Sequence, residues 1–261
     1  IVIKGQSEKP VYLWIEDDKA ELRDASHLWG KETAVVDETI KDELGDKRIC
    51  VTQVGRAGEN LVRFAAVMND VTRAAGRTGM GAVMGSKKLK AVAVRGKGRV
   101  PLADAKRVNK QARWLAENFM TTSGDMHDHG TDGGLEYLDA SGGLPTRNFQ
   151  EGSFEHAKAI TGATMTNTIL VGRDNCYACP IYCKRVVEVS NRYKVDRAYG
   201  GPEYETVGSL GSVCGIGDLE AIAYANQLCN AYGLDTISAG MTIAWAMECF
   251  ERGLIGPEDT G

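Results

Sequence analysis

Three cysteines stand close together in the second half of the chain. In the run Cys176-Tyr-Ala-Cys179-Pro-Ile-Tyr-Cys183 they have the spacing C-x2-C-x3-C. This spacing lets three thiolates bind one small metal centre. Cubane iron–sulfur clusters are held by such clustered cysteines, with one more cysteine supplied from elsewhere. The run therefore predicts an iron–sulfur centre and makes electron transfer the first functional hypothesis.

A structural zinc site is the main alternative for these cysteines. Zinc usually takes four protein ligands, often in two pairs, and the chain has one triplet and no second C-x2-C pair. His127 and His129 lie upstream and could complete a zinc site, but no pattern selects them. The spacing favours the cluster. The remaining cysteines are expected to be buried small apolar residues rather than ligands: Cys50, Cys214, Cys229 and Cys249.

The composition narrows the class of protein. The 261 residues are 43% hydrophobic and 25% charged, which is typical of a globular protein, and a net charge of -4 gives no reason to expect nucleic acid or an anionic membrane as partner. No apolar run approaches the roughly 18 residues needed to span a bilayer, and no signal peptide is visible. An odd number of cysteines, three of them together, suits metal ligation in a reducing cytosol, so we expect a cytoplasmic protein.

The two ends of the sequence indicate an internal piece of a longer protein. The first residue is Ile1 and not Met, and Ile1-Val-Ile3 is typical of the interior of a strand. The last residues, 256–261, follow a predicted helix. We therefore expect that a site shared with other parts of the protein is incomplete here.

The pattern of apolar residues predicts an α+β fold with a change of character near Gly96–Pro101. Residues 1–97 are expected to be the C-terminal part of a β-rich domain, with strands at 11–15, 49–54, 61–68 and 91–94 and a helix at 35–44 that ends at Gly45. Residues 98–261 are expected to be the N-terminal part of a helical domain, with 121–153 as a glycine-rich loop.

Three helices are predicted in this second part. Val108, Ala112, Leu115 and Phe119 recur with helical spacing and share one face. Asp218 is a good N-cap for a helix that carries Ile222, Ala225, Cys229 and Tyr232. A further helix follows Asp235, with Gly253 as its end and with these residues facing inward: Ile237, Met241, Trp245 and Cys249.

A glycine-rich segment lies at the end of the first part. Glycines stand at 76, 79, 81 and 85, and cationic side chains flank them at Arg73, Arg77, Lys87 and Lys88. Glycines let a backbone approach a ligand closely, and successive N–H groups beside cations form a nest for an anion. The spacing matches neither the P-loop nor the Rossmann fingerprint. The alternative is a set of tight turns between strands.

Four stretches of the sequence together resemble the tungsten-containing aldehyde ferredoxin oxidoreductases. They are Arg73 to Val92, Gly142-Gly-Leu-Pro-Thr-Arg-Asn-Phe149, the cysteine run, and Gly201-Pro-Glu-Tyr-Glu-Thr206 followed by Asn230-Ala-Tyr-Gly-Leu-Asp235. The stretches appear in the family's order. The resemblance implies a β-rich base for a bis-pyranopterin cofactor of tungsten or molybdenum, helical domains that cover it, a [4Fe-4S] cluster, and Mg²⁺ bridging the pterin phosphates.

The resemblance also implies roles for individual residues. Cys176, Cys179 and Cys183 match cluster ligands, and the fourth ligand would lie outside this chain. Arg73 and Ala74 match a segment that meets the pterin and its phosphates, and the other expected cofactor contacts of this segment are Gly76, Arg77, Gly79 and Gly81. Asn230 and Asp235 match the ends of a motif whose carboxylates bind pterin N–H groups. Asn230 departs from the family's Asp, which removes a charge, and an N-cap is the alternative role for Asp235.

The same resemblance makes Glu205 the expected catalytic residue, with Glu203 as the second choice. A carboxylate beside the metal could activate water or accept the proton lost from the substrate. The alternative is a glutamate held by a neighbouring helix N-terminus. The implied activity is oxidation of an aldehyde to a carboxylate, with electrons passed to ferredoxin, in a homodimer or a larger complex. An aromatic acyl-thioester reductase subunit of the same superfamily, a non-catalytic electron carrier and a structural zinc protein remain as alternatives.

Overall fold

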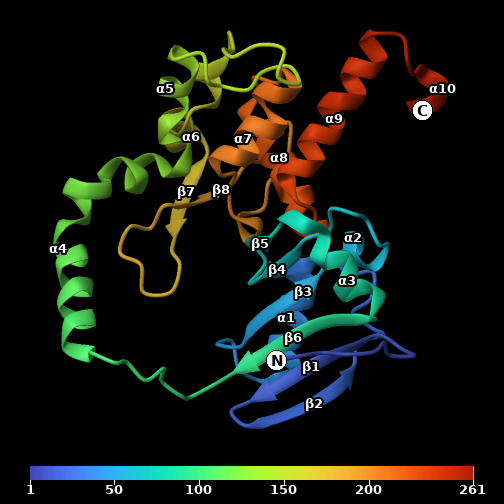
Figure 1. Ribbon diagram of the computed structural model, residues 1–261, viewed down its shortest axis with the longest axis vertical. Helices are drawn as coiled ribbons and strands as arrows, with labels where there is room; N and C mark the ends of the chain where they lie inside the picture. The colour runs from blue at the N-terminus through green and yellow to red at the C-terminus, as the bar shows by residue number, and fades with distance from the viewer. Residues whose placement is uncertain (261) are drawn as a thin grey trace. The chain divides into compact units, whose positions relative to one another are not determined.

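The computed structural model describes residues 1–260 and divides into two compact units (Figure 1). The first unit contains Ile1–Arg99 together with Leu228–Asp235, and the second contains Val100–Gln227 together with Thr236–Gly261. No helix within residues 1–260 is both long enough and apolar enough to cross a bilayer.

A six-stranded mixed sheet organises the described part of the first unit. Its strand order is β2-β1-β6-β3-β4-β5, and β1 pairs with β6 in parallel while the other neighbours are antiparallel. The strands are β1 (Val11–Glu16), β2 (Lys19–Asp24), β3 (Cys50–Val54), β4 (Val67–Asn69), β5 (Arg73–Ala75) and β6 (Leu89–Arg95). This order places the glycine-rich segment directly after the edge strand β5.

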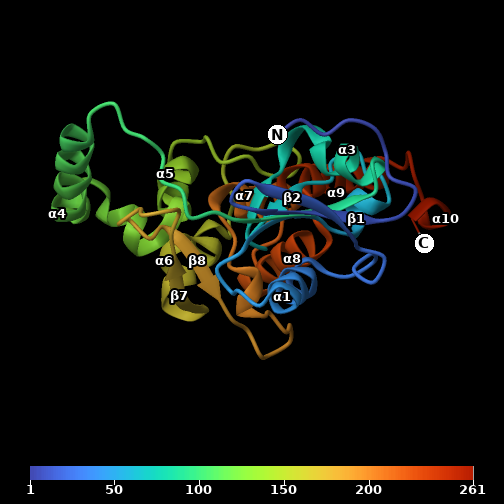
Figure 2. The ribbon, with the colours of Figure 1, turned by 90° about the horizontal axis from the view of Figure 1, so that it is seen from below.

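Three helices cover this sheet: α1 (Thr33–Leu44), α2 (Arg56–Glu59) and α3 (Met80–Ser86). Figure 2 shows α1 and α3 on opposite sides of the sheet. Helix α1 buries Val36 and Ile40, which are one helical turn apart, and ends at Gly45 in the left-handed conformation with a φ of 70°. The core cluster on this side is Tyr12, Ala25, Leu28, Val36, Ile40, Ile49, Val51, Ala91 and Ala93.

Helices dominate the second unit, together with the two-stranded sheet β7–β8. The elements are α4 (Ala105–His129), α5 (Leu135–Ala140), α6 (Gly162–Thr168), β7 (Leu170–Asp174), β8 (Lys184–Val187), α7 (Tyr204–Leu210), α9 (Thr236–Glu251) and α10 (Pro257–Thr260). Helix α8 (Leu219–Tyr232) begins in this unit, and its last residues belong to the first. The Asp218 carboxylate accepts hydrogen bonds from the N–H groups of Glu220 and Ala221, at 3.0 and 3.1 Å, which confirms the predicted N-cap.

Helix α4 of the second unit has no buried face in the described chain. None of its residues is buried, and Val108 and Trp114 are 47% and 52% exposed. The backbone leaves helical geometry at Ser123, and the helix continues beyond it to His129. The predicted helix over Val108–Phe119 is therefore confirmed, although its apolar face lies open in the described chain.

Five local predictions from the sequence were wrong. The strand expected at 61–68 is limited to Val67–Asn69, because Leu61 adopts a φ of 58° and the chain turns before Ala65. Residues 121–153 are not one loop, since α4 extends to His129 and α5 follows. Ile1-Val-Ile3 is not a strand. Cys50, the first residue of β3, is exposed and not buried. Trp245 on α9 is 60% exposed and does not face inward.

Candidate functional site

The cysteine run forms the loop between β7 and β8 in the second unit. A tight turn begins it, because the Cys179 N–H donates to the Cys176 carbonyl at 3.0 Å. Ala178 and Tyr182 adopt left-handed backbone with φ of 54° and 53°, which is uncommon for residues other than glycine. The Asn175 side chain donates to the Cys179 carbonyl at 2.9 Å and braces the turn. The loop is thus built from strained local geometry, as functional loops often are.

The three thiols are available as a set of soft donors. Cys176 is exposed, Cys179 and Cys183 are half-buried, and all three are free. Burial raises the pKa of the Cys183 thiol, and negative charge at Glu203 and at the other two cysteines raises it further. Within residues 1–260, no three or more side chains of His, Cys, Asp and Glu lie close enough together to hold a metal ion. The residue types nevertheless fit a thiolate-bound cluster, because a single loop carries three cysteines that interact electrostatically with one another.

The two candidate glutamates lie in different surroundings at the start of α7. Both carboxylate oxygens of Glu203 are engaged: Thr131 Oγ1 donates at 2.6 Å and Lys184 Nζ at 3.2 Å. The Tyr204 N–H donates to the same threonine oxygen at 3.0 Å. Glu205, in the first turn of α7, is exposed. The structure therefore places Glu203 beside the end of the cysteine loop and leaves the Glu205 side chain open.

Asp132 is a candidate residue that sequence reasoning missed. It lies in the 3-10 segment Gly130–Gly134, is 1% exposed, and neither of its carboxylate oxygens has a hydrogen-bond partner within residues 1–260. Burial and the nearby charge of Glu203 raise its pKa to about 8. A buried carboxyl avoids the cost of charge by keeping its proton, so Asp132 is neutral at pH 7. Its sequence setting, Thr-Asp-Gly-Gly, is typical of an exposed turn and gave no signal of burial.

We expect Asp132 to make the stability of the protein depend on pH. Between about pH 4 and pH 8 the native carboxyl keeps its proton while the unfolded chain has released it, so the free energy of unfolding falls as pH rises, by about 1.4 kcal/mol per unit. Above pH 8 both states are ionised and the dependence ends. Urea unfolding of wild type and Asp132→Asn at pH 5, 6, 7 and 8 measures this. The free energy of unfolding of Asp132→Asn should increase relative to that of wild type as pH rises. A difference that stays constant between pH 5 and pH 8 would contradict the burial of the Asp132 carboxyl.

Three glycines of the glycine-rich segment are required by close packing of backbone on backbone. A Cβ at Gly79 would lie 2.1 Å from the Arg63 carbonyl oxygen, one at Gly81 2.4 Å from that of Ala66, and one at Gly85 2.0 Å from that of Gly58. Gly79 also has a φ of 70°. These contacts favour the packing role for Gly79, Gly81 and Gly85, and they hold α3 against α2 and the chain that enters β4.

Gly79→Ala should therefore destabilise the protein by about 2–4 kcal/mol, the sum of overpacking and a left-handed backbone. Gly45→Ala is the matched control, because Gly45 has the same φ of 70° but nothing within 4 Å of an added Cβ. The control should cost only about 1 kcal/mol. Urea midpoints of the two variants measure the difference. Equal losses would mean that the contact with Arg63 relaxes freely.

Gly76 and Arg77 meet Asp235 at the edge of this segment. A Cβ at Gly76 would lie 3.0 Å from Asp235 Oδ1, and Arg77 Nε lies 3.8 Å from Asp235 Oδ2. Asp235 is 4% exposed, and its N–H donates to the Phe64 carbonyl at 3.1 Å. Its place immediately before α9 is also that of an N-cap. Two stretches about 160 positions apart in the chain are thus brought together, as a shared cofactor contact requires.

The remaining predicted cofactor contacts also belong to the first unit. Arg73 opens β5 and pairs with Asn69, and the Ala74 that follows is exposed. Asn230 is buried, and its carbonyl accepts a hydrogen bond from Thr33 Oγ1 at 2.8 Å. The exposed backbone at Ala74 suits contact with a ligand, whereas Asn230 is anchored through its main chain to the start of α1.

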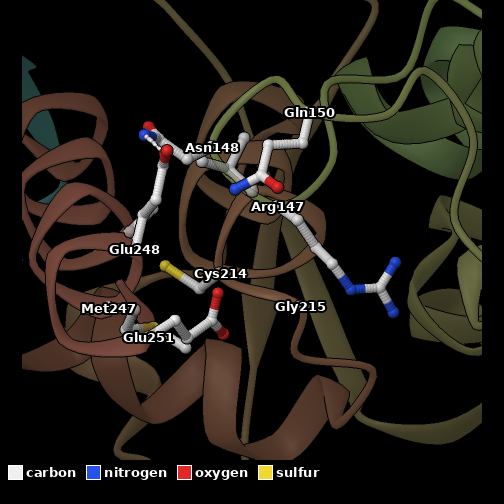
Figure 3. Close-up of a pocket in the computed structure, with 10 residues that line it drawn as sticks. Arg147, Asn148, Gln150, Cys214, Gly215, Met247, Glu248 and Glu251 are labelled. Atoms are coloured by element: carbon white, nitrogen blue, oxygen red, sulfur yellow. Dashed lines mark hydrogen bonds between the residues drawn. The ribbon is translucent and has the colours of Figure 1, made fainter. Parts of the chain in front are cut away.

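A small cavity of about 200 Å³ lies in the second unit (Figure 3). Arg147, Asn148 and Phe149 all have positive φ, of 44°, 52° and 64°, and the N–H groups of the first two donate to the Ser212 and Val213 carbonyls. The Asn148 amide donates to the Glu248 carboxylate at 2.6 Å. Strained backbone of this kind clusters at functional segments. The Gly142–Phe149 stretch of the sequence therefore shapes a polar cavity.

Two family models match this chain, one in each part. The model described as the N-terminal domain of aldehyde ferredoxin oxidoreductase matches residues 1–96, and the model of its domains 2 and 3 matches residues 106–261. The chain belongs to the aldehyde ferredoxin oxidoreductase family. This finding confirms the resemblance read from the four sequence stretches.

Relatives within the aldehyde ferredoxin oxidoreductase family align with the whole length of this chain. The tungsten-containing aldehyde ferredoxin oxidoreductases of Thermococcus kodakarensis and Pyrococcus furiosus are 48% and 45% identical to it over 264 and 265 residues. A WOR-like subunit of an aliphatic sulfonate oxidoreductase from P. furiosus is 32% identical over 278 residues. These alignments cover 100% of this chain but only 43–44% of the relatives, so the chain spans less than half of their length.

A solved structure shares the fold. The active site complex BamBC of benzoyl coenzyme A reductase, in complex with 1,5-dienoyl-CoA, superimposes with a TM-score of 0.75 and 27% identity. The match covers 98% of this chain and 40% of that one. The mixed helix-and-sheet architecture described above is therefore that of a known aldehyde ferredoxin oxidoreductase relative.

Proposed function

We propose that the protein containing this chain is a tungsten-pterin oxidoreductase that oxidises an aldehyde to a carboxylate and passes electrons through a [4Fe-4S] cluster to ferredoxin. Membership of the family across the whole chain is the observation that carries this proposal. In the overall reaction, aldehyde and water give carboxylate, three protons and two electrons. Tungsten held by two pyranopterins supplies the two-electron chemistry when bound, and the protein positions and insulates it.

In this proposal the loop between β7 and β8 holds the cluster. Cys176, Cys179 and Cys183 are three of its ligands, and a fourth comes from outside this chain. Three free thiols on one loop support the assignment. One cysteine triplet with no second C-x2-C pair in the sequence favours a thiolate-bound cluster over a four-ligand zinc site.

The pterin would be held by the edge of the first unit. The Asp235 carboxylate would accept hydrogen bonds from pterin N–H groups, and the Arg77 guanidinium, 3.8 Å from that carboxylate, would balance its charge or bind a phosphate. The absence of a side chain at Gly76 avoids a tight contact with that carboxylate, since a Cβ would lie 3.0 Å from Oδ1. Arg73 would supply a cation and the exposed Ala74 main-chain groups to the pterin phosphates, where Mg²⁺ would add further positive charge. The amide of Asn230 brings no charge to the same surface.

Glu205 is the proposed proton acceptor of the reaction. A general base must be open to the substrate, and the Glu205 side chain is exposed, whereas Thr131 and Lys184 already hold the Glu203 carboxylate. Electrons leave to ferredoxin or another low-potential carrier, in a cytoplasmic enzyme that works as a homodimer or in a larger complex.

One second function has a specific observation in its favour. The structural similarity to the BamBC complex supports an aromatic acyl-thioester reductase subunit, which would drive electrons into the substrate instead of removing them. Assays with aldehydes and with aromatic acyl-CoA thioesters separate the two reactions. The higher identity to the tungsten-containing aldehyde enzymes, 48% against 27%, favours aldehyde oxidation.

Elemental analysis of the full-length protein, expressed with tungstate and purified without oxygen, tests the proposal. We expect about one tungsten or molybdenum and about four iron atoms per chain, as a pterin centre and a cubane cluster require. Zinc near one per chain, with neither heavy metal nor iron, would overturn the proposal and leave the cysteine loop as a structural site. Iron without tungsten or molybdenum would instead indicate an electron carrier.

A further inference from the structure

Arg185 is a buried arginine beside the cysteine loop. It stands in β8, two residues after Cys183, and is 1% exposed. Arginine is almost never fully buried unless a carboxylate pairs with it. Among the residues that the structure describes, no carboxylate forms an ion pair with Arg185; its guanidinium donates to four main-chain carbonyls.

These carbonyls belong to two segments that Arg185 joins. Nε donates to the Cys183 carbonyl at 2.9 Å and Nη2 to that of Tyr182 at 3.0 Å, at the end of the cysteine loop. Nη1 donates to the Asp128 carbonyl at 2.9 Å and Nη2 to that of His127 at 2.8 Å, in the last turn of α4. Carbonyls at a helix C-terminus lack helical partners and carry partial negative charge, so they solvate a cation well. The guanidinium therefore fastens the loop to the helix.

Glu203 and Asp128 act on the positive charge of Arg185 through their electric field, but neither forms a direct ion pair with it. Lys184, its neighbour, is paired with Glu203 at 3.2 Å, and Asp132 is neutral at pH 7. Arg173 also reaches the His127 carbonyl, at 3.0 Å, but it is exposed and water screens it. The Arg185 guanidinium and the Cys183 thiolate attract each other. A fixed cation thus stands against one of the three proposed cluster ligands.

We propose that Arg185 is a positioning residue that holds the cysteine loop in place and, through its fixed charge, raises the reduction potential of the cluster that the loop binds. This inference rests on the proposed function. When a cluster gains one electron its net charge becomes more negative by one, while Arg185 keeps its proton and exchanges no electron. A nearby positive charge stabilises the reduced form more than the oxidised form, because charge and hydrogen bonding around the sulfurs set the potential of such centres.

Three variants of the full-length protein, purified anaerobically, test the proposal: Arg185→Gln, Arg185→Lys and Arg173→Gln. The readouts are iron content, urea midpoint and the reduction potential of the cluster from electron paramagnetic resonance at controlled potentials. For Arg185→Gln, the ratio of reduced to oxidised cluster at the wild-type midpoint should fall about tenfold, which equals 59 mV for one electron. Arg185→Lys keeps the charge and should stay closer to wild type. Arg173→Gln, which removes an exposed charge from the same carbonyls, should leave the potential unchanged.

The outcomes separate this inference from the proposed function. Full iron and a wild-type potential in Arg185→Gln would overturn the inference. Loss of iron in Arg185→Gln, with iron retained in Arg185→Lys and wild-type urea midpoints, would support it, because a cation is then needed to hold the loop. Loss of iron in both variants together with lower midpoints would overturn it and make Arg185 a folding residue. Wild-type protein without iron would instead refute the proposed function.

Discussion

Cys179→Ser is expected to remove the iron from the protein and to abolish electron transfer to ferredoxin. Cys179 is the middle cysteine of the loop, and its N–H already closes the turn on Cys176. A serine hydroxyl keeps the size of the side chain but is not a thiolate, so it cannot replace the sulfur ligand of a cluster. Iron content should fall from about four atoms per chain to near zero, and the brown colour should disappear.

Cys50→Ser provides the matched control for this experiment. Cys50 is also a free cysteine, but it lies at the start of β3 in the first unit, away from the loop in the chain. It should keep full iron and activity. If Cys179→Ser kept its iron, or if zinc rather than iron were lost, the assignment of the loop to an iron–sulfur cluster would be wrong.

The helix ends that the sequence predicted correctly are each marked by one residue with a known role at that position. Gly45 ends α1 because only glycine adopts a φ of 70° at little cost, and Asp218 begins α8 because its carboxylate accepts two main-chain hydrogen bonds. The apolar run at 61–68 lacked such signals, and an apolar run alone does not separate a strand from a buried turn. Trp245 was expected inside from its helical spacing, but spacing does not tell which face of a helix has a neighbour.

In the candidate site, too, local sequence patterns were predicted correctly and long-range contacts were not. The C-x2-C-x3-C spacing identified the loop because ligand spacing is local in the chain. Asp132 and Arg185 gave no signal, since an acid without a partner and an arginine held only by carbonyls are defined by tertiary contacts. The nearness of Gly76 to Asp235 is likewise a long-range fact, and so is the packing of Gly79 against Arg63. Those glycines looked like an anion nest in the sequence, yet the contacts that require glycine are with the protein's own backbone.

The second large effect is expected from Glu205→Gln, which should keep iron and tungsten but lower the rate of aldehyde oxidation by about 10²–10⁴-fold, the usual contribution of a general base. The amide has the same shape as the carboxylate and cannot accept a proton. Because Glu205 is exposed on α7 and none of the hydrogen bonds that brace Glu203 depends on it, the fold should not change. Turnover with a set of aldehydes, metal content and the urea midpoint measure the three parts of this expectation.

Glu203→Gln distinguishes catalysis from support at the same helix end. This variant loses the ion pair with Lys184 at 3.2 Å, while its amide can still accept the hydrogen bond from Thr131, so its urea midpoint should fall. The negative charge that opposes ionisation of Asp132 is also removed, so the pKa of Asp132 should move down from about 8. Turnover should fall much less than in Glu205→Gln. If the order were reversed, with both metals retained, the proton acceptor would be Glu203.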